Sequence, residues 1–278
     1  MQKKYRYFIP TSITLSSLIL ALLSVMYAME EELVTAFWLS FLCTLFDRFD
    51  GIVARKLNAT GNFGMELDSL VDLMAFGATP AILLYKVTST FSPHFDGKLK
   101  FLPMIVASFW VIASSLRLAK FNVVAQAKKF NSIFQGIPMP IAAGFILAPM
   151  LVLAKYNTAF NYNVTGFDPR IMGTFSGSHW IYTLLLGWGA LIGYGMISHL
   201  RVPKLSKPPQ DWRKTYMLIN ALLVYICIVF RVFPEFLLFV AMQFLFISLY
   251  FHFFTEARKQ EKYIHLLDVL SWKLDEEE

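Results

Sequence analysis

Long apolar runs separated by short polar stretches recur along the whole chain. A helix needs about 20 apolar residues to cross the hydrocarbon of a bilayer, and eight runs approach that length. Their ranges are 8–29, 33–54, 65–87, 101–122, 137–155, 179–200, 214–232 and 235–255. The period-two alternation of a membrane barrel is absent, and in lipid only helices and closed barrels satisfy their backbone. The pattern therefore predicts an all-α, polytopic membrane protein with about eight transmembrane helices.

A basic, proline-rich segment, RVPKLSKPPQDWRK at 201–214, divides the predicted helices, with six before it and two after it. We expect residues 1–200 to form a six-helix membrane core. Residues 201–255 are expected to form a cytoplasmic linker and a transmembrane hairpin, and residues 256–278 a charged cytoplasmic tail. The first apolar run is longer than the core of a signal peptide, so we interpret it as a spanning helix.

Composition and charge agree with this interpretation. The chain is 56% hydrophobic and only 16% charged, whereas soluble domains are roughly 45–50% apolar and about 25% charged. Its net charge of +6 could suggest nucleic acid in a soluble protein. Here most lysines and arginines fall in loops on one predicted side of the membrane, so we expect a lipid bilayer and no nucleic acid as partner. The positive-inside rule then places both termini in the cytoplasm. We expect the protein to lie in the cytoplasmic (inner) membrane.

Charged residues gather in one stretch, DRFDGIVARKLNATGNFGMELDSLVD at 47–72, at the cytoplasmic ends of two predicted helices. On the first helix, a helical repeat puts five residues on one face, namely Asp47, Asp50, Gly51, Ala54 and Arg55. On the second helix, Gly64, Asp68 and Asp72 follow each other at intervals of four. Turn-forming residues between the helices allow them to fold back antiparallel. The four aspartates are therefore expected to surround one shared volume.

Four carboxylates in one volume repel each other, and a divalent cation relieves that repulsion. Mg²⁺ and Mn²⁺ prefer such oxygens, and Mg²⁺ often binds through carboxylates and substrate phosphates together. Two other interpretations are open. The aspartates could be interfacial charges paired with Arg48 and Arg55, or they could mark the ion pathway of a transporter. Transporters tend to carry repeats and charges near the midplane, which this sequence lacks, so the spacing favours phosphate chemistry.

The stretch matches every fixed position of D-x2-D-G-x2-A-R-x8-G-x3-D-x3-D, and in this it resembles the CDP-alcohol phosphotransferases. The resemblance implies a six-helix membrane core that forms a homodimer. It implies transfer of a phosphoryl-linked group from a CDP-activated donor to an alcohol, with release of CMP. Two divalent ions, Mg²⁺ or Mn²⁺, would be held by Asp47, Asp50, Asp68 and Asp72. Asp72 would also act as the general base, while the nucleotide would contact Gly51, Ala54, Arg55 and Gly64.

The stretch FIPTSITL (8–15) resembles the entry helix of that family. Three further stretches are similar to the membrane-embedded phosphatidylserine synthases within the family, namely DSLVDLMAFGATPAILLY (68–85), SSLRLAKFNV (114–123) and FQGIPMPIAA (134–143). This similarity implies CDP-diacylglycerol as donor and L-serine as acceptor, with glycerol 3-phosphate or inositol as alternative acceptors. We predict that Arg117, Lys120 and Asn122, near the cytoplasmic end of the fourth helix, contact serine or a phosphate.

Overall fold

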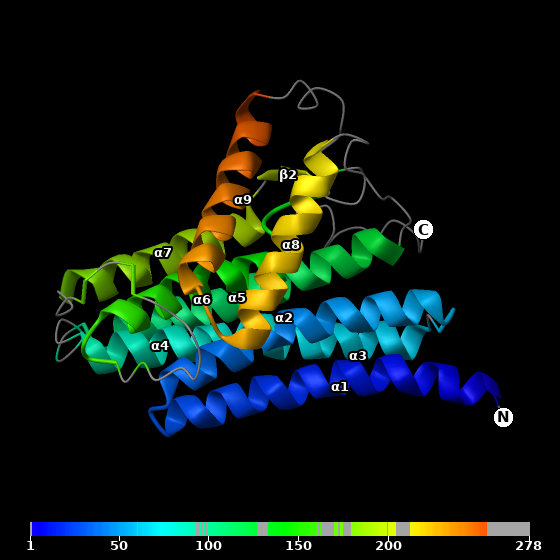
Figure 1. The fold of residues 1–278 in the computed structure, drawn as a ribbon, viewed down its shortest axis with the longest axis horizontal. Helices are drawn as coiled ribbons and strands as arrows, with labels where there is room; N and C mark the ends of the chain where they lie inside the picture. The colour runs from blue at the N-terminus through cyan, green and yellow to red at the C-terminus, as the bar shows by residue number, and fades with distance from the viewer. Residues whose placement is uncertain are drawn as a thin grey trace, which may run out of the picture.

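The computed structural model of the protein shows a bundle of long helices (Figure 1). It describes residues 2–59, 61–92, 95, 97, 99–126, 133–160, 162, 170–171, 173–174, 179–198, 200–203 and 212–254. The tail predicted at 256–278 lies outside these residues, as does most of the basic linker. The α1–α7 helices run along the long axis, with the N-terminus at one end of it (Figure 1).

Each of the eight predicted helices coincides with helical structure, which confirms the predicted fold class. The helices are α1 (Gln2–Met29), α2 (Leu33–Lys56), α3 (Asn62–Asp72), η1 (Leu73–Ala78), α4 (Thr79–Phe91), α5 (Phe101–Gln126), α6 (Met139–Tyr156), α7 (His179–Ile197), α8 (Trp212–Phe230) and α9 (Pro234–Phe254). The third predicted helix consists of α3, η1 and α4 in succession, and η1 is a π-helical turn.

Five of the described helical stretches are long and apolar enough to cross a membrane. They are Tyr7–Met29, Asn62–Phe91, Phe101–Val123, Met139–Tyr156 and Trp180–Ile197. The α2 helix is as long as these, but its last ten residues carry five charges. Shorter apolar stretches lie in α8 and α9. This is the architecture of an integral membrane protein.

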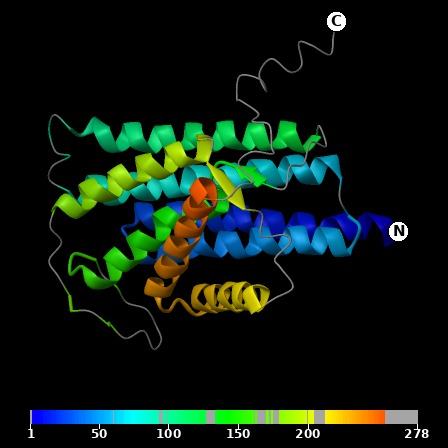
Figure 2. The ribbon, with the colours of Figure 1, turned by 90° about the horizontal axis from the view of Figure 1, so that it is seen from above.

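The centre of the bundle is α6, because 72% of its residues are buried compared with 22% in α5. The α1 and α2 helices pack closely as a hairpin, joined by a turn in which Glu31 has φ +67°. The α8 and α9 helices run steeply across the long axis (Figure 1), and α9 packs mainly on α6. Seen from above, α5 and α8 lie on opposite flanks (Figure 2). The last two helices therefore differ in direction from the core.

Two short strands add to the predicted helices. The β1 strand (Ile133–Gln135) pairs antiparallel with β2 (Arg201–Pro203). The next residue, Gly136, has φ +78°, and a Cβ there would lie 2.2 Å from the carbonyl oxygen of Met196. Only glycine fits such a position. This pairing ties the start of α6 to the end of α7, and α7 ends at Ile197 instead of the predicted residue 200.

Candidate active site

The four aspartates come from the C-terminal half of α2 and from α3. Carboxylate oxygens of Asp47, Asp50 and Asp68 all lie within 4.8 Å of one another. Asp72, one helical turn after Asp68, lies within electrostatic range of Asp47, Asp68 and Asp50. The structure thus brings together all four carboxylates that the spacing placed on two opposed stripes.

This donor set fits a divalent cation. Divalent ions such as Mg²⁺ and Ca²⁺ bind oxygen at about 2.0–2.6 Å, so oxygens this close can share one ion. Carboxylates held this close repel one another when they are ionised. A cation bound between them would balance part of that charge. The cluster could therefore hold a metal.

The α1 helix supports the cluster from the side. The Thr14 hydroxyl donates a hydrogen bond to Oδ2 of Asp50 at 2.8 Å. Asp50 is only 5% exposed, so this contact fixes the direction of a nearly buried carboxylate. Thr11, one turn earlier, instead donates to the carbonyl oxygen of Tyr7 at 2.7 Å. Groups that orient ligands in this way tune a metal site almost as strongly as the ligands do.

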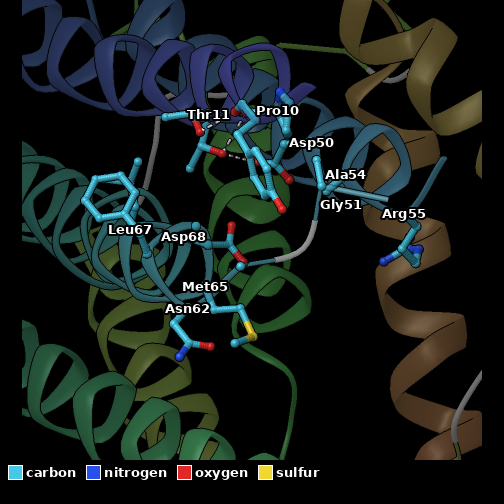
Figure 3. A pocket seen from close by; sticks show the side chains of 16 residues that line it. Pro10, Thr11, Asp50, Gly51, Ala54, Arg55, Asn62, Met65, Leu67 and Asp68 are labelled. Atoms are coloured by element: carbon cyan, nitrogen blue, oxygen red, sulfur yellow. Dashed lines mark hydrogen bonds between the residues drawn. The ribbon is translucent and has the colours of Figure 1, made fainter. Parts of the chain in front are cut away.

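A pocket of about 530 Å³ opens beside the cluster, between α1, α2 and α3. Asp50 and Asp68 face it from two different helices (Figure 3). The pocket is also lined by all four residues that the sequence predicted at the nucleotide, Gly51, Ala54, Arg55 and Gly64. Asp47 and Asp72 are not among the residues that line this pocket.

Two of the three glycines that line the pocket, Gly51 and Gly64, leave different kinds of space. A Cβ at Gly51 would lie 3.3 Å from Nη1 of Arg55, so this glycine lets the guanidinium fold back along α2. A Cβ at Gly64 would meet nothing within 4 Å. The space above Gly64 is therefore open, and a ligand can approach the backbone there.

The α5 helix carries the three residues that were predicted to contact the acceptor, and their surroundings differ. Arg117 lies within electrostatic range of Asp72, and its buried Nε has no hydrogen-bond partner among the described residues. Asn122 donates to the hydroxyl of Ser69 on α3 at 3.0 Å. Lys120 is half-buried between them along the helix. Arg117 therefore combines burial, proximity to the cluster and an unused donor.

Sequence reasoning did not find Thr14, nor the pocket residues Tyr7, Asn62 and Phe63. A signal for Thr14 was present, because Thr11, Ser12 and Thr14 interrupt an otherwise apolar run. No spacing rule connects them to an aspartate 36 residues later. Only the packing of α1 against α2 reveals that contact.

Comparison with known proteins adds to this geometry. The CDP-alcohol phosphatidyltransferase family matches residues 7–188. A CDP-diacylglycerol–serine O-phosphatidyltransferase of Helicobacter pylori is 37% identical over 117 residues, 42% of this chain and 46% of the relative. The protein of that name from Bacillus subtilis is 36% identical over 116 residues, 42% of this chain and 62% of the relative.

An archaetidylserine synthase of Methanothermobacter thermautotrophicus is 35% identical over 109 residues, 38% of this chain and 43% of the relative. The chain thus spans about half the length of the curated relatives that it matches. The family match is broader, since it covers α2, α3 and the whole acidic cluster together with most of the core. The chain therefore belongs to the CDP-alcohol phosphatidyltransferase family.

Proposed function

We propose that this protein is a phosphatidylserine synthase, which transfers a phosphatidyl group from CDP-diacylglycerol to the hydroxyl of L-serine and releases CMP. The observation that carries the proposal is the pocket in which Asp50 and Asp68 meet Gly51, Ala54, Arg55 and Gly64. The relatives that match this chain over 117 and 116 residues are named for serine. Glycerol 3-phosphate and inositol are the competing acceptors within the family.

The pocket suits a nucleoside diphosphate. Gly51, Ala54 and Gly64 provide a floor without long side chains, and the space over Gly64 is open. Arg55 lies on the same wall, where its guanidinium can pair with phosphate oxygens. We assign the cytidine and its phosphates to this pocket, with the lipid tails of the donor in the bilayer.

Asp47, Asp50, Asp68 and Asp72 would hold two divalent ions, Mg²⁺ or Mn²⁺, at the edge of the pocket. When bound, such ions supply the counter-charge for the diphosphate and for the departing CMP. Thr14 keeps Asp50 in the direction that ligation needs. Proton transfer and binding of the acceptor are assigned to side chains of the protein.

Asp72 is assigned as the general base, because the family resemblance implies this role and because Asp72 lies within electrostatic range of the other three aspartates and of Arg117. The serine oxygen forms a bond to the phosphorus that carries diacylglycerol, and the bond from that phosphorus to CMP breaks. The electron pair leaves on CMP, and Asp72 takes the hydroxyl proton. A positioned base of this kind contributes roughly 10²–10⁴-fold to the rate.

Arg117 is assigned to the serine carboxylate or to a phosphate, because its buried Nε lacks a partner in the described part of the chain. A planar guanidinium binds carboxylate in a two-pronged geometry that lysine cannot reproduce. Lys120 and Asn122 would complete this side of the site. Arg117→Lys should therefore raise the apparent KM for serine, with a smaller change in the KM for the donor, and an unchanged serine KM would remove this assignment.

We also propose the cellular setting. The distribution of lysine and arginine puts both termini and the acidic cluster at the cytoplasmic face of the inner membrane. The functional unit would be a homodimer. Cross-linking in native membranes and accessibility of cysteines introduced near each terminus would test these two points separately.

The activity is tested with purified protein in mixed micelles or vesicles that contain CDP-diacylglycerol and Mn²⁺ or Mg²⁺. Labelled serine, glycerol 3-phosphate and inositol are offered in parallel, and the lipid product and CMP are measured. We expect product with serine only, and complete loss on chelation that is reversed by the metal. Product with another acceptor alone would overturn the assignment of serine, and no product with any acceptor would overturn the proposed activity.

A further inference from the structure

The helix that carries Asp72 changes its geometry directly after that residue. Residues Leu73–Ala78 form the π-helical turn η1, and the amide of Thr79 donates to the carbonyl of Met74, five residues earlier. Such turns are rare and occur often at functional sites. A wider turn changes the angular relation between the side chains before it and those after it. The direction of Asp72 relative to the core therefore depends on this turn.

The sequence explains why the turn widens at this place. Pro80 has no amide hydrogen, and its ring would collide with the carbonyl four residues earlier in a regular α-helix. That carbonyl belongs to Phe76, in the middle of η1. It therefore lacks the donor that a regular helix would provide.

A tryptophan on α5 supplies a donor instead. The indole Nε1–H of Trp110 donates to the Phe76 carbonyl oxygen at 3.3 Å. Trp110 is only 1% exposed, so no water competes for this carbonyl from its side. The contact joins α5 to the π turn at the carbonyl that, because of Pro80, lacks the i+4 donor of a regular α-helix.

The same face of α5 packs along η1 and reaches Asp72 at the end of α3. After Trp110 comes Ser114, whose Cβ would lie 3.3 Å from a Cβ added to Gly77. One turn further, Arg117 interacts electrostatically with Asp72. These three positions are spaced i, i+4 and i+7, which is one stripe of a helix. A single surface of α5 thus holds the π turn and faces the proposed base.

We propose that Trp110 is a positioning residue for Asp72: its indole N–H holds the π turn, and the turn sets how the Asp72 carboxylate faces the metal cluster and Arg117. The inference rests on the proposed function, in which Asp72 is a metal ligand and the base. Trp110 is not among the residues that line the pocket beside the cluster. Its effect is therefore on alignment, to which turnover is sensitive.

The first test replaces Trp110 by phenylalanine, which keeps an aromatic ring but removes the donor. W110F should lower kcat roughly ten- to a hundredfold and leave the KM for CDP-diacylglycerol within about twofold.

Two matched variants serve as controls. Trp38 is fully buried, and its Nε1 has no partner among the described residues, whereas Trp188 donates to the Phe145 carbonyl at 2.8 Å, away from the cluster. W38F and W188F should leave kcat within about twofold.

The second test uses a variant that is expected to fold at least as well as the natural chain. Pro80→Ala gives position 80 an amide and removes a poor helix former, so the turn should tighten and the Phe76 carbonyl should regain a helical donor. We expect P80A to raise or preserve the thermal stability while kcat falls by at least about tenfold. A purely structural role for the turn would not separate these two quantities.

A third measurement does not depend on turnover. Mn²⁺ binding, titrated by electron paramagnetic resonance, should weaken about threefold or more in W110F and P80A but not in W38F. Unchanged Mn²⁺ affinity in both W110F and P80A would overturn the inference, whether or not the enzyme is active. If the natural chain is active, unchanged kcat in both variants would also overturn it. If the natural chain transfers no phosphatidyl group to serine, the proposed function fails, while the Mn²⁺ titration still decides the role of Trp110.

Discussion

Two buried clusters of charged residues in this protein are built in contrasting ways. Where α2 and α3 meet, four carboxylates of the same sign lie together. Where α6 ends and α9 begins, opposite charges meet: Nζ of Lys155 lies 2.8 Å from Oε1 of Glu235, with the side chains 0% and 19% exposed. The Tyr156 hydroxyl donates to the same Glu235 oxygen. One cluster pairs opposite charges within the chain, whereas the other gathers like charges that a cation from outside could balance.

The difference separates a structural site from a functional one. A buried ion pair fixes how two elements pack, and here it joins α9 to the central helix α6. Like charges held together repel one another, and such arrangements of carboxylates are concentrated at functional sites. We therefore expect a substitution in the acidic cluster to lower turnover without lowering stability, and a substitution in the Lys155–Glu235 pair to lower stability with little change in turnover.

The largest expected effect is on turnover. Asp72→Asn should lower kcat by roughly 10²–10⁴-fold, because the serine hydroxyl loses its base. Nucleotide binding should remain, since Asp72 does not line the pocket. The free energy of unfolding should not fall, because one of four repelling charges is removed. Product formation, CMP binding and thermal unfolding measure these three quantities.

Glu66→Gln is the matched control for that variant, because Glu66 is an exposed carboxylate on the same helix. It should leave kcat within about twofold. Substantial activity in Asp72→Asn would exclude Asp72 as the base. A large loss of stability would instead place Asp72 among the structural charges.

The second largest effect is on stability. Lys155→Met leaves Glu235 without its cation, and breaking a buried pair in this way costs about 3 kcal/mol of unfolding free energy. Turnover by the remaining folded protein should change little. Lys86→Met is the control, because the Lys86–Glu31 pair is longer, 3.7 Å, and more exposed, 28% and 76%. Exposed pairs contribute at most about 1 kcal/mol to the free energy of unfolding. Equal losses of unfolding free energy in Lys155→Met and Lys86→Met would therefore contradict a structural role for the Lys155–Glu235 pair.

A smaller effect is expected one contact away from the cluster. Thr14→Val keeps the shape of the side chain but removes the hydrogen bond to Asp50. Loss of such an orienting contact typically lowers metal affinity or activity by about 10–100-fold. Thr11→Val, which removes only a bond within α1, should have a much weaker effect on Mn²⁺ affinity. Equal effects of the two variants would argue against an orienting role for Thr14.

The smallest effect concerns the pocket floor. Gly64→Ala adds a methyl group that meets nothing within 4 Å, so the stability without ligand should not change. If the nucleotide lies against this backbone, the KM for CDP-diacylglycerol should rise about tenfold. An unchanged KM would place the donor elsewhere in the pocket.

Much of this molecule could be predicted from its pattern of residues. The apolar runs set the number and place of the helices, because lipid leaves the backbone few alternatives. The spacing of Asp47, Asp50, Asp68 and Asp72 predicted their meeting, since they lie on only two neighbouring helices joined by a short turn. Local periodicity was sufficient for that part of the site.

Contacts between distant segments could not be predicted in the same way. Thr14 reaches Asp50 across 36 residues, and Trp110 reaches Phe76 across 34. The sequence shows Pro80 and Gly77, but not which helix supplies a donor to the carbonyl that Pro80 leaves. The steep course of α8 and α9 across the core was equally hidden, because hydropathy gives a helix its length and not its direction.

The sequence by itself determined the helices, the two acidic stripes and the family, because each follows from a repeat or spacing within a short stretch of chain. Tertiary structure alone decided which surface lies behind Asp72, which hydroxyl orients Asp50 and which charges are balanced within the protein. Those contacts depend on how helices far apart in the chain pack together, and hydrophobic burial drives that packing without specifying a polar partner.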